Sequence, residues 1–342
     1  MEKSVVMGKG LQERRTRRLA IITPAVAADN NGNWQTAERW QGLLTGWCAA
    51  RVRNQWPDPE ADGDQALIAL HARRSADALL AWHQRHGGER LALVLTGTDL
   101  YRDILTDPSA QRSLALARWL VVLQERGPRA LPMAFRFKTR VLFQSSPARK
   151  TLVKSNRHLR VLMVGHLRDE KSPETLFAAA RLLAGRDDIF IDHIGAALDP
   201  ALGAVAQATM AAAPRYRWLG ARTHQETRRR IQQAHALVHA SRMEGGAHAI
   251  LEAVVSGTPV LASRVEGNLG MLGDDYGGYF PWGDAHSLTD LLIRCRLRQG
   301  EGEGGGLLRQ LADQCARRAP LFHPSAERAA LRRLVDDLFG DA

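Results

Sequence analysis

Short apolar runs alternate with longer amphipathic stretches along most of the chain. In the first half, the runs that predict strands lie at 19–25, 66–70, 91–97, 119–124 and 141–146, and helical periodicity appears at 34–46, 75–86 and 109–118. The runs are rich in Leu, Ile and Val, as expected for strands that are buried on both faces. Strands that alternate with helices predict βαβ units and a mostly parallel sheet.

The same pattern occurs again in the second half. Predicted strands lie at 160–167, 189–195, 216–220, 236–241 and 259–263, with helices at 173–184, 204–213, 225–234 and 248–256. We therefore expect an α/β protein with two doubly wound, Rossmann-like domains that face an interdomain cleft. Ligands of such sheets bind at the carboxyl ends of the strands.

The polar segment 145–158 separates the two halves and predicts a linker. We expect a disordered basic tail over 1–17, an N-terminal domain over 18–150 and a C-terminal domain over 151–322. The glycine-rich stretch 300–306 predicts a flexible loop, and a helix within 323–342 is expected to pack back toward the N-terminal domain.

Composition narrows the class of protein. The chain has 342 residues, of which 45% are hydrophobic, so disorder along its whole length is excluded. Its 47 Lys and Arg outnumber 36 Asp and Glu, a net charge of +11 that favours an anionic ligand. No acidic residue occurs from Arg126 to Arg168, a basic block with eleven Lys and Arg. A solvated basic face is one interpretation of this block, and a cleft suited to anions is the other.

Cysteine usage and hydropathy bear on the compartment. Cys48, Cys295 and Cys315 lie far apart and show no metal-ligand or disulfide-framework spacing, which favours a reducing cytosol. No apolar run approaches the roughly 18 residues that span a bilayer, and the N-terminus lacks the pattern of a secretory signal. We expect a cytoplasmic protein without stable membrane association. The oligomeric state is left open.

The most specific stretch is SRMEGGAHAILEAVVSGTPVLASRVEGN at 241–268. A strand ends near Ser241, a glutamate and two glycines follow, and a helix begins near Ala247. The amides and positive dipole end of that helix suit a diphosphate. Glu252 comes eight residues after Glu244, about two helical turns on. The two carboxylates can accept hydrogen bonds from hydroxyls on either side of the phosphates, which suggests a sugar and a ribose.

Glu244 and Glu252 form an E-x7-E pattern, followed by SGTPVLAS and YGGYFPWGD. Together these segments resemble retaining glycosyltransferases with the GT-B fold, of the family 4 type, most strongly from Arg160 to Arg294. The resemblance implies that the C-terminal domain binds a nucleotide-sugar, with Glu244 on the sugar and Glu252 on the ribose. The other donor-binding residues that we expect are Gly220, Arg222, Gly245, Gly246, Ala247, His248, Ile250 and Leu251.

A second segment, VGHLRDEKSPETL at 164–176, resembles the family element that carries a lysine for the departing diphosphate. Lys171 matches that lysine, and a fixed cation there stabilises charge on the leaving phosphate. His166 stands where the family has an arginine, and Arg168 can substitute for it. The resemblance implies transfer with retention. Because the cationic side chains could do a metal's work, we expect no metal or other cofactor.

The N-terminal domain should supply the acceptor side. The resemblance places an acceptor-facing loop at Asn30, Asn31, Gly32 and Asn33, for which a helix cap with a turn is the alternative. LTGTDLYRD at 95–103 resembles the family's H-G-x-D segment with threonine at the histidine position. It implies that Thr96, Gly97, Thr98 and Asp99 line the cleft, although Asp99 could instead cap a helix. Lys154 of the basic block completes the expected acceptor set.

Three segments, at 23–47, 95–105 and 241–253, look closest to the selenosugar synthases of selenoneine biosynthesis. That resemblance implies transfer of a hexosamine from a UDP-sugar, UDP-GlcNAc foremost, to selenophosphate, with release of UDP. Selenophosphate is already an anion and needs no base, whereas an alcohol acceptor must lose a proton. A threonine in place of the family histidine agrees with such an acceptor.

Three alternatives stay open at this point. A conventional retaining glycosyltransferase would use an alcohol or lipid acceptor, and its membrane contact could use the basic tail. A GT-B epimerase would act on the nucleotide-sugar alone. A basic nucleic-acid-binding protein is disfavoured, because aromatic residues make up only 6% of the chain and no motif that reads nucleic acid appears.

Overall fold

The computed structural model describes residues 16–24, 32–299 and 306–340. Asn30, Asn31, nearly all of the predicted tail and most of the predicted loop 300–306 lie outside this part. The chain forms two compact units, which are described separately. Unit 1 comprises Met1–Gln144 and Pro324–Ala342, and unit 2 comprises Ser145–His323.

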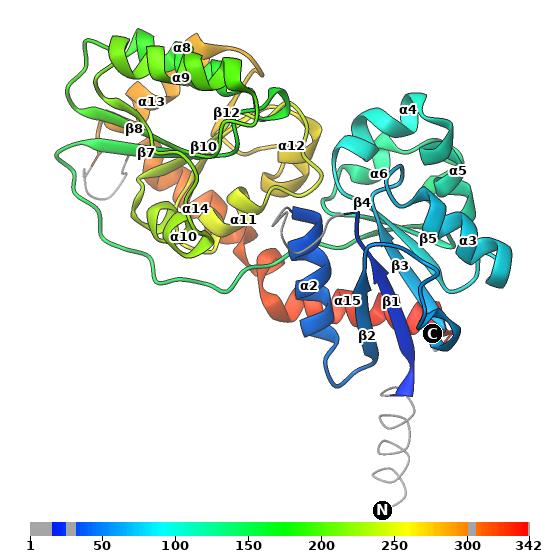
Figure 1. Cartoon of the computed structure of the whole chain (residues 1–342). Coiled ribbons are helices and arrows are strands. Elements are labelled where there is room, and N and C mark those ends of the chain that lie inside the picture. Colours follow the sequence, from blue (N-terminus) through cyan, green and yellow to red (C-terminus); the bar gives the residue numbers. More distant parts are fainter. Residues whose placement is uncertain (1–15, 25–31, 300–305, 341–342) are drawn as a thin grey trace, which may run out of the picture. The chain divides into compact units, whose positions relative to one another are not determined.

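Unit 1 is built on a parallel sheet of six strands in the order β2-β1-β3-β4-β5-β6 (Figure 1). The strands are β1 (Arg18–Ile22), β2 (Ala49–Arg53), β3 (Ala66–Leu70), β4 (Leu91–Leu95), β5 (Trp119–Val122) and β6 (Thr139–Val141). The larger helices are α2 (Gly32–Leu44), α3 (Ala76–His86), α5 (Pro108–Leu116) and α15 (Pro324–Phe339). The short helical segments are η2 (Ala61–Gly63), η3 (Asp99–Asp103), α4 (Ile104–Thr106), α6 (Gly127–Ala130) and α7 (Met133–Arg136).

The side chains of successive strand residues pack into two separate apolar cores, one on each face of this sheet. Ile22 and Leu67 pack in one core with Trp82 of α3, whereas Ile21 and Ile68 pack in the other with α2 and α15. Side chains alternate between the faces of a strand, so an uninterrupted apolar run fills both cores. This explains why the strand runs of the sequence show no polar alternation.

Helix α15 returns from the C-terminal end of the chain to the sheet of unit 1. Leu331, Leu334 and Val335 join the core beneath α2. Glu327 is buried, and its carboxylate accepts hydrogen bonds from Trp40 Nε1 at 2.8 Å and Arg39 Nε at 3.1 Å. Burying this carboxylate is tolerated because both partners donate to it.

Unit 2 holds a second parallel sheet of six strands, in the order β12-β11-β10-β7-β8-β9. The strands are β7 (Leu159–Val164), β8 (Ile189–Ile194), β9 (Tyr216–Trp218), β10 (Ala236–His239), β11 (Val260–Ser263) and β12 (Tyr279–Phe280). The helices are α8 (Pro173–Leu182), α9 (Pro200–Ala212), α10 (His224–Gln233), α11 (His248–Val254), α12 (Glu266–Leu272), α13 (Ala285–Arg296) and α14 (Leu307–Arg318), with η4 (Asp169–Lys171) and η5 (Ala319–Phe322).

Both sheets reverse their strand order next to the first strand of the unit. In unit 1 the reversal lies between β1 and β3, and in unit 2 it lies between β7 and β10. The predicted doubly wound α/β class is thereby confirmed for each unit. The loops after β7 and β10 are the expected ligand-binding loops of unit 2.

Several predicted elements differ from the structure. The sequence pattern missed β2 and β12, which are edge strands with little continuous apolar character. The predicted strand 141–146 is wrong, because β6 ends at Val141 and the chain then leaves the sheet. The units divide after Gln144 rather than after residue 150, since Ser146 N donates to Phe322 O and Arg149 N donates to Val255 O, both within unit 2.

Candidate active site

Two loops at the reversal point of the unit 2 sheet carry the chemistry predicted from the sequence. One loop follows β7 and contains Lys171, and the other follows β10 and contains Glu244. Arg242 N donates to Glu170 O at 2.9 Å, and Arg242 and Asp169 form an ion pair at 2.6 Å. These contacts hold the two loops together at the carboxyl edge of the sheet.

Lys171, Glu244 and His239 form a compact polar cluster. Lys171 Nζ donates to Glu244 Oε1 at 2.6 Å, and His239 Nε2 lies 3.1 Å from the same oxygen. Burial alone would raise the pKa of Glu244, but the charges of Lys171 and His239 and their hydrogen bonds outweigh it and hold the pKa well below its usual range. Glu244 is therefore a fixed, buried anion beside a cation that is 18% exposed.

The backbone around Glu244 is closely packed. A Cβ placed on Gly267, near the start of α12, would lie 2.0 Å from Glu244 O. Only glycine permits α12 to approach the loop this closely. Trp282 Nε1 donates to Ser172 Oγ at 2.9 Å and fixes the segment after Lys171. The position of the carboxylate is thus set by its surroundings and not by a mobile loop tip.

Glu252 has its own set of partners on α11. It is buried, His224 Nε2 lies 2.6 Å from its Oε1, and Arg228 Nε lies 3.8 Å from the same oxygen. Burial lowers the pKa of Arg228, partly opposed by Glu252. His224 is the first residue of α10 and its side chain is 57% exposed, so a ligand can reach the pair from the surface.

His166 and Arg168 lie in the loop after β7, as expected. His166 Nδ1 accepts a hydrogen bond from Ala196 N at 3.0 Å, which leaves the proton of a neutral ring on Nε2. Partial burial and the charges of Arg168 and Lys171 lower the pKa of His166. Arg168 is exposed and lies 3.8 Å from Glu170. The neighbourhood thus contains two permanent cations and a histidine that favours the neutral form.

The other predicted donor residues fall into two groups. Gly245, Gly246 and Ala247 form the turn that leads into α11, and His248 is its first residue. The side chains of Ile250 and Leu251 are fully buried in the core, so only their backbone could contact a donor. Their donor-binding role remains a prediction.

Gly220 and Arg222 follow β9. Gly220 has a φ of 68°, and its carbonyl accepts a hydrogen bond from Gly195 N. Arg222 is exposed and pairs with Glu226 at 3.4 Å. Both residues lie at the carboxyl edge of the unit 2 sheet, but no contact joins them directly to Glu252 in the described part of the chain. Their donor-binding role remains a prediction.

The loop after β4 in unit 1 is organised around Asp99. Its carboxylate is fully buried and accepts hydrogen bonds from the backbone amides of Ala72, Thr96 and Gly97, all at 2.9 Å. Asp99 therefore holds the loops after β3 and β4 together and cannot face an acceptor, contrary to the prediction. The alternative of a helix cap is also wrong, because Asp99 is the first residue of η3 and Thr98 precedes it.

His71 lies beside this loop and was not predicted as a site residue. It directly follows β3, has a φ of 77°, and its Nε2 lies 3.3 Å from Thr98 Oγ1. Burial lowers the pKa of His71, although Asp99 and Asp103 act in the opposite direction. A positive φ is uncommon for a residue other than glycine, and residues in such strained conformations cluster at functional sites.

The remaining acceptor residues are only partly described. Gly32 is exposed at the start of α2, Asn33 follows it, and Thr36 Oγ1 donates to Gly32 O at 2.7 Å. Asn30 and Asn31 lie outside the described residues. Thr96 and Thr98 are half-buried beside Gly97, which is buried.

Lys154 does not lie with the other predicted site residues. It contacts Thr258, which lies two residues before β11, and it lies before β7 in the chain, so it belongs to the amino edge of the unit 2 sheet. Lys171 and Glu244 lie at the opposite, carboxyl edge. The prediction that Lys154 borders the site fails because a strand of parallel sheet separates the two ends of the basic block.

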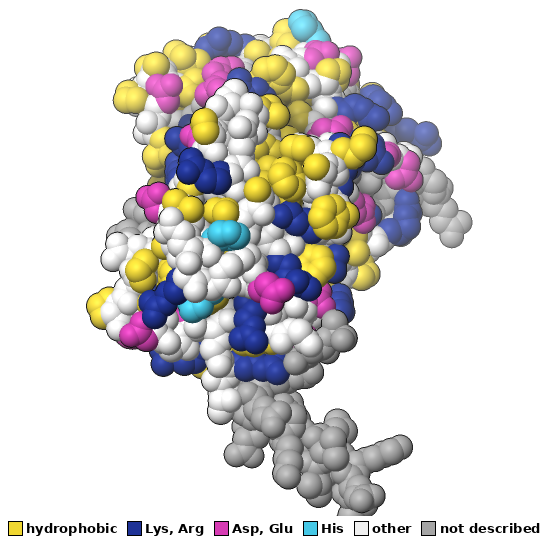
Figure 2. Space-filling model, turned by 90° about the vertical axis from the view of Figure 1, so that its right-hand side faces the viewer, with side chains coloured by type: hydrophobic (Ala, Val, Ile, Leu, Met, Phe, Trp, Pro, Cys, Tyr) yellow, Lys and Arg dark blue, Asp and Glu magenta, His cyan; other side chains and the backbone are white. Residues whose placement is uncertain are grey.

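The basic block also meets acidic partners that are distant in sequence. Arg140 lies 3.6 Å from Asp337, and Arg160 lies 3.2 Å from Asp192. Lys138 donates to the carbonyl of Ala117. Figure 2 shows Lys and Arg spread over the drawn face with Asp and Glu among them. The block is therefore largely part of the ion pairs and hydrogen bonds of each unit and not a continuous anion-binding surface.

Sequence reasoning missed three histidines, His71, His224 and His239. A usable signal existed for His71, because the polar run His-Ala-Arg-Arg directly follows the buried strand ALIAL. His239 is a histidine within an otherwise apolar strand, which also marks it. His224 gives no such signal, since its pairing with Glu252 depends on how α10 packs near α11.

The described residues contain no group of three or more His, Cys, Asp or Glu side chains that could hold a metal ion. No helix among them has the length and apolar character to cross a membrane. Cys48, Cys295 and Cys315 are free and buried.

Comparison with known proteins identifies the architecture. Sucrose-phosphate synthase from Thermosynechococcus elongatus superposes with a TM-score of 0.75 at 16% identity, covering 95% of this chain and 100% of that one. HepE from Anabaena, solved with UDP-glucose, gives 0.71 at 13% identity, with coverage of 95% and 100%. The pneumococcal O-GlcNAc transferase GtfA, solved with UDP and GlcNAc, gives 0.57 at 16% identity, with coverage of 80% and 57%.

A family model matches in addition to these structures. Residues 145–296, which include Lys171, Glu244 and Glu252, match the family of glycosyl transferases group 1. This range begins where unit 2 begins and contains both loops of the Lys171–Glu244 cluster. The chain has the GT-B fold, and residues 145–296 of its second unit are similar to glycosyl transferases group 1.

Proposed function

We propose that this protein transfers a hexosamine from a UDP-sugar, UDP-GlcNAc foremost, to selenophosphate, with release of UDP. The observation that carries the glycosyl-transfer part is the cluster of Lys171, Glu244 and His239 at the reversal point of the unit 2 sheet, within the range similar to glycosyl transferases group 1. The selenophosphate part rests on the sequence resemblance and on the chemistry of the loops in unit 1.

A UDP-sugar donor is supported by the spacing of the two buried glutamates. Glu244 and Glu252 lie at the two ends of the turn and first helical residues of α11, so one can accept from sugar hydroxyls and the other from the ribose. Structural neighbours were solved with UDP-glucose, and with UDP and GlcNAc. Exposed His224 beside Glu252 leaves this end of the site accessible.

Lys171 is the cation that we assign to the leaving diphosphate. An ammonium carries three N–H donors, so Lys171 can keep its bond to Glu244 Oε1 and donate to a phosphate oxygen at the same time. Charge accumulates on the diphosphate as the bond to C1 breaks, and a preorganised cation stabilises it. Arg168 and the Nε2–H of His166 lie in the same loop and can add donors.

The reaction needs neither an oxidant nor a base. A lone pair of the selenophosphate selenium forms a bond to C1 of the sugar, the bond from C1 to the phosphate oxygen breaks, and its electron pair leaves with UDP. The product is a hexosaminyl selenophosphate. A water molecule that later attacks its phosphorus would release inorganic phosphate and leave the selenosugar.

The loops after β3 and β4 suit an anionic acceptor. Exposed Arg73 and Arg74 lie two and three residues after His71, so cations border this edge of unit 1. Both nearby carboxylates are engaged, Asp99 by three backbone amides and Asp103 by Arg73 and Arg102. An alcohol acceptor would need a base here, and neutral His71 would be the candidate.

The function is tested by the acceptor dependence of UDP release. We expect the purified protein to release UDP from UDP-GlcNAc when selenophosphate is added and not when inorganic phosphate is added. His71→Asn should retain at least a third of this rate, because selenophosphate requires no proton removal. Equal release with phosphate, or loss of nearly all selenophosphate-dependent release in His71→Asn, would contradict the proposed acceptor.

A further inference from the structure

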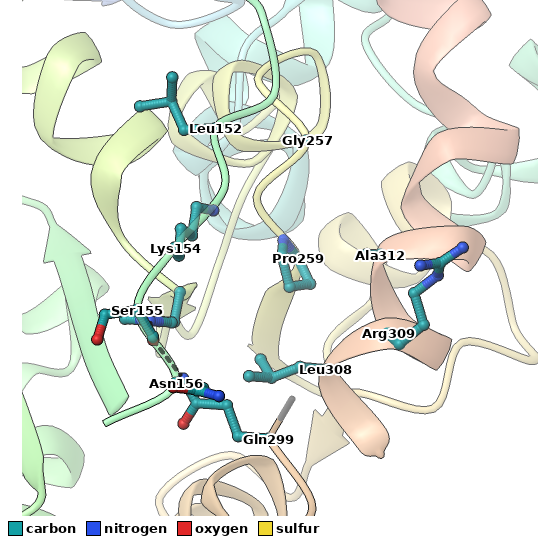
Figure 3. Close-up of a pocket in the computed structure, with 11 residues that line it drawn as sticks. Leu152, Lys154, Ser155, Asn156, Gly257, Pro259, Gln299, Leu308, Arg309 and Ala312 are labelled. Carbon is teal, nitrogen blue, oxygen red and sulfur yellow. Dashed lines mark hydrogen bonds between the residues drawn. The ribbon is translucent and has the colours of Figure 1, made fainter. Parts of the chain in front are cut away.

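A cavity in unit 2 lies away from the cluster of Lys171 and Glu244. It has a volume of about 240 Å³ and opens between the segment 152–156, the turn before β11 and the start of α14 (Figure 3). Its lining comprises Leu152, Lys154, Ser155, Asn156, His235, Gly257, Pro259, Gln299, Leu308, Arg309 and Ala312. His235 and Pro259 directly precede β10 and β11, so the cavity lies at the amino edge of the sheet.

Lys154 supplies a cation within this cavity. Its Nζ donates to Thr258 Oγ1 at 3.2 Å, and that hydroxyl in turn donates to Ile231 O at 2.9 Å. No acidic residue in the described part of the chain forms an ion pair with Lys154. Burial lowers the pKa of Lys154 to about 8. A half-buried ammonium with one neutral partner has donors left over for an anion.

His235 and the amide nitrogen of Gln299 already have partners, whereas Gln299 Oε1 is buried without a hydrogen-bond partner among the described residues. His235 Nδ1 accepts from Arg160 N at 2.9 Å, so its Nε2 carries the proton and donates to Ser155 O at 2.7 Å. Gln299 Nε2 donates to Ser155 O and His158 O. These bonds hold the wall of the cavity in place and leave His235 uncharged.

The remaining charge of the lining points elsewhere. Arg309 is 75% exposed and pairs with Asp313 at 3.2 Å, and Figure 3 shows its guanidinium directed away from Lys154. Leu308, by contrast, points from α14 toward the segment that carries Lys154. Leu152, Pro259, Leu308 and Ala312 give the cavity its apolar surface. The cavity therefore combines one inward-facing cation, Lys154, with an apolar surface.

We propose that this cavity binds a small aliphatic monocarboxylate, with its carboxylate on Lys154 and its chain against Pro259 and Leu308. One cation matches a single negative charge, whereas a phosphate dianion would need more donors than this lining offers. The volume is below the range of about 300–1,000 Å³ that drug-sized ligands fill. It corresponds to roughly eight water volumes, which suits a carboxylic acid of four to six carbons.

The test is a titration of the full-length protein with pentanoate, followed by saturation-transfer NMR. Pentanamide serves as the uncharged isostere and inorganic phosphate as the alternative anion. We expect pentanoate to bind, and pentanamide and phosphate to bind at least tenfold more weakly. Lys154→Met should weaken pentanoate at least tenfold. The matched control is Lys150→Met, which removes an exposed lysine from the same segment and should leave the affinity unchanged.

The pH dependence gives a second readout that a purely structural role of Lys154 would not produce. Protonated Lys154 is required, so pentanoate affinity should fall about tenfold between pH 7 and pH 9, as the ammonium with a pKa of about 8 loses its proton. The Lys154→Met variant should show no such fall. Its thermal unfolding is recorded beside that of Lys150→Met to verify that both variants are folded.

Three results would overturn the proposal. Wild-type protein that shows no pentanoate binding refutes it outright, and so does equal binding of pentanoate and pentanamide. Glu301 and Glu303 lie outside the described residues but near the cavity in sequence, so the titration is repeated on Glu301→Gln/Glu303→Gln. Binding that appears only in this double variant would assign Lys154 to a carboxylate of the chain itself and not to a ligand.

Discussion

Replacing Lys171 by methionine removes the ammonium that lies 2.6 Å from the Glu244 carboxylate while keeping most of the apolar stem. Glu244 is buried and would be left with His239 as its remaining partner in this cluster. The substitution therefore tests two roles of Lys171 together, the stabilisation of a buried anion and the stabilisation of the leaving diphosphate. The two roles predict effects on different observables.

The magnitude follows from the geometry. Two unit charges 2.6 Å apart attract by about 6 kcal/mol at an effective dielectric constant of about 20. Desolvation of both groups offsets much of this, so we expect Lys171→Met to lower the free energy of unfolding by about 2–3 kcal/mol at pH 7. Loss of a fixed charge at the leaving group should lower kcat by about 10²–10³. Lys171→Arg keeps the charge and should lose less in both measurements.

The ionisation of Glu244 also determines in which direction the free energy of unfolding changes with pH. Its pKa in the folded protein lies well below the unfolded value of about 4.3. The stabilisation is therefore present above about pH 4 and is lost as the pH falls toward the folded-state pKa. In Lys171→Met the pKa of Glu244 in the folded protein rises toward its unfolded value. The difference in stability between wild type and variant should narrow by about 1.4 kcal/mol per pH unit below about pH 4.

The assay is urea unfolding of wild type, Lys171→Met, Glu244→Gln and the double variant, together with UDP release from UDP-GlcNAc. The double-mutant cycle should give a coupling free energy of about 2–3 kcal/mol, as expected for groups in direct contact. The reasoning would be refuted by a coupling energy near zero. Wild-type turnover in Lys171→Met would refute the leaving-group role, whatever the unfolding data show.

Three further predictions concern other parts of the molecule. Glu252→Gln should weaken UDP binding by about 1–3 kcal/mol in calorimetry, because a charged hydrogen-bond acceptor is lost. The control Glu226→Gln should bind UDP with wild-type affinity. Wild-type affinity in Glu252→Gln would contradict the ribose assignment. Gly267→Ala should destabilise the protein in urea unfolding, because the new Cβ would lie 2.0 Å from Glu244 O. The control Gly42→Ala in α2 places its Cβ within 4 Å of nothing and should stabilise the protein by about 0.5–1 kcal/mol. Equal urea midpoints for the two variants would argue against the close packing at Glu244. The three cysteine thiols are buried, and burial raises the pKa of Cys48 to about 11. A thiol reagent at pH 8 should therefore label the native protein slowly, and it should label all three thiols once the protein is denatured. Fast labelling of the native protein would show that these thiols are accessible.

Much of the fold could be predicted because both sheets are parallel and buried. Runs such as ALIAL and LALVL are apolar on both faces, and their alternation with helical periodicity is visible without a structure. The edge strands β2 and β12 were missed because one of their sides lacks a neighbour. β2 has the sequence AARVR, in which Arg51 and Arg53 pair with acidic residues from the following loop.

The candidate site could be predicted only where the chemistry lies within one segment. Glu244 and Glu252 belong to the loop and helix after a single strand, and their spacing is visible in the sequence. The partners of these residues come from other segments. Lys171 reaches Glu244 across 73 positions, and His224 reaches Glu252 across 28. The family resemblance predicted Lys171, but nothing in the sequence predicted the packing that brings His224 to Glu252.

The residues that were assigned wrongly share one cause. Asp99 lies in the correct loop, but its side chain faces the interior. Lys154 is basic and near the linker, but it lies at the amino edge of the sheet. Sequence position places a residue on an element, and the direction of its side chain depends on packing against elements that are distant in the chain.

The central claim is that the sugar is transferred to selenium. The most direct measurement incubates the protein with UDP-GlcNAc and selenophosphate and analyses the products by mass spectrometry. We predict a hexosamine product that carries the isotope pattern of selenium, formed together with UDP, and strongly reduced in Lys171→Met. UDP and free GlcNAc without any selenium-containing sugar would contradict the claim, and the similarity of residues 145–296 to glycosyl transferases group 1 would be unaffected.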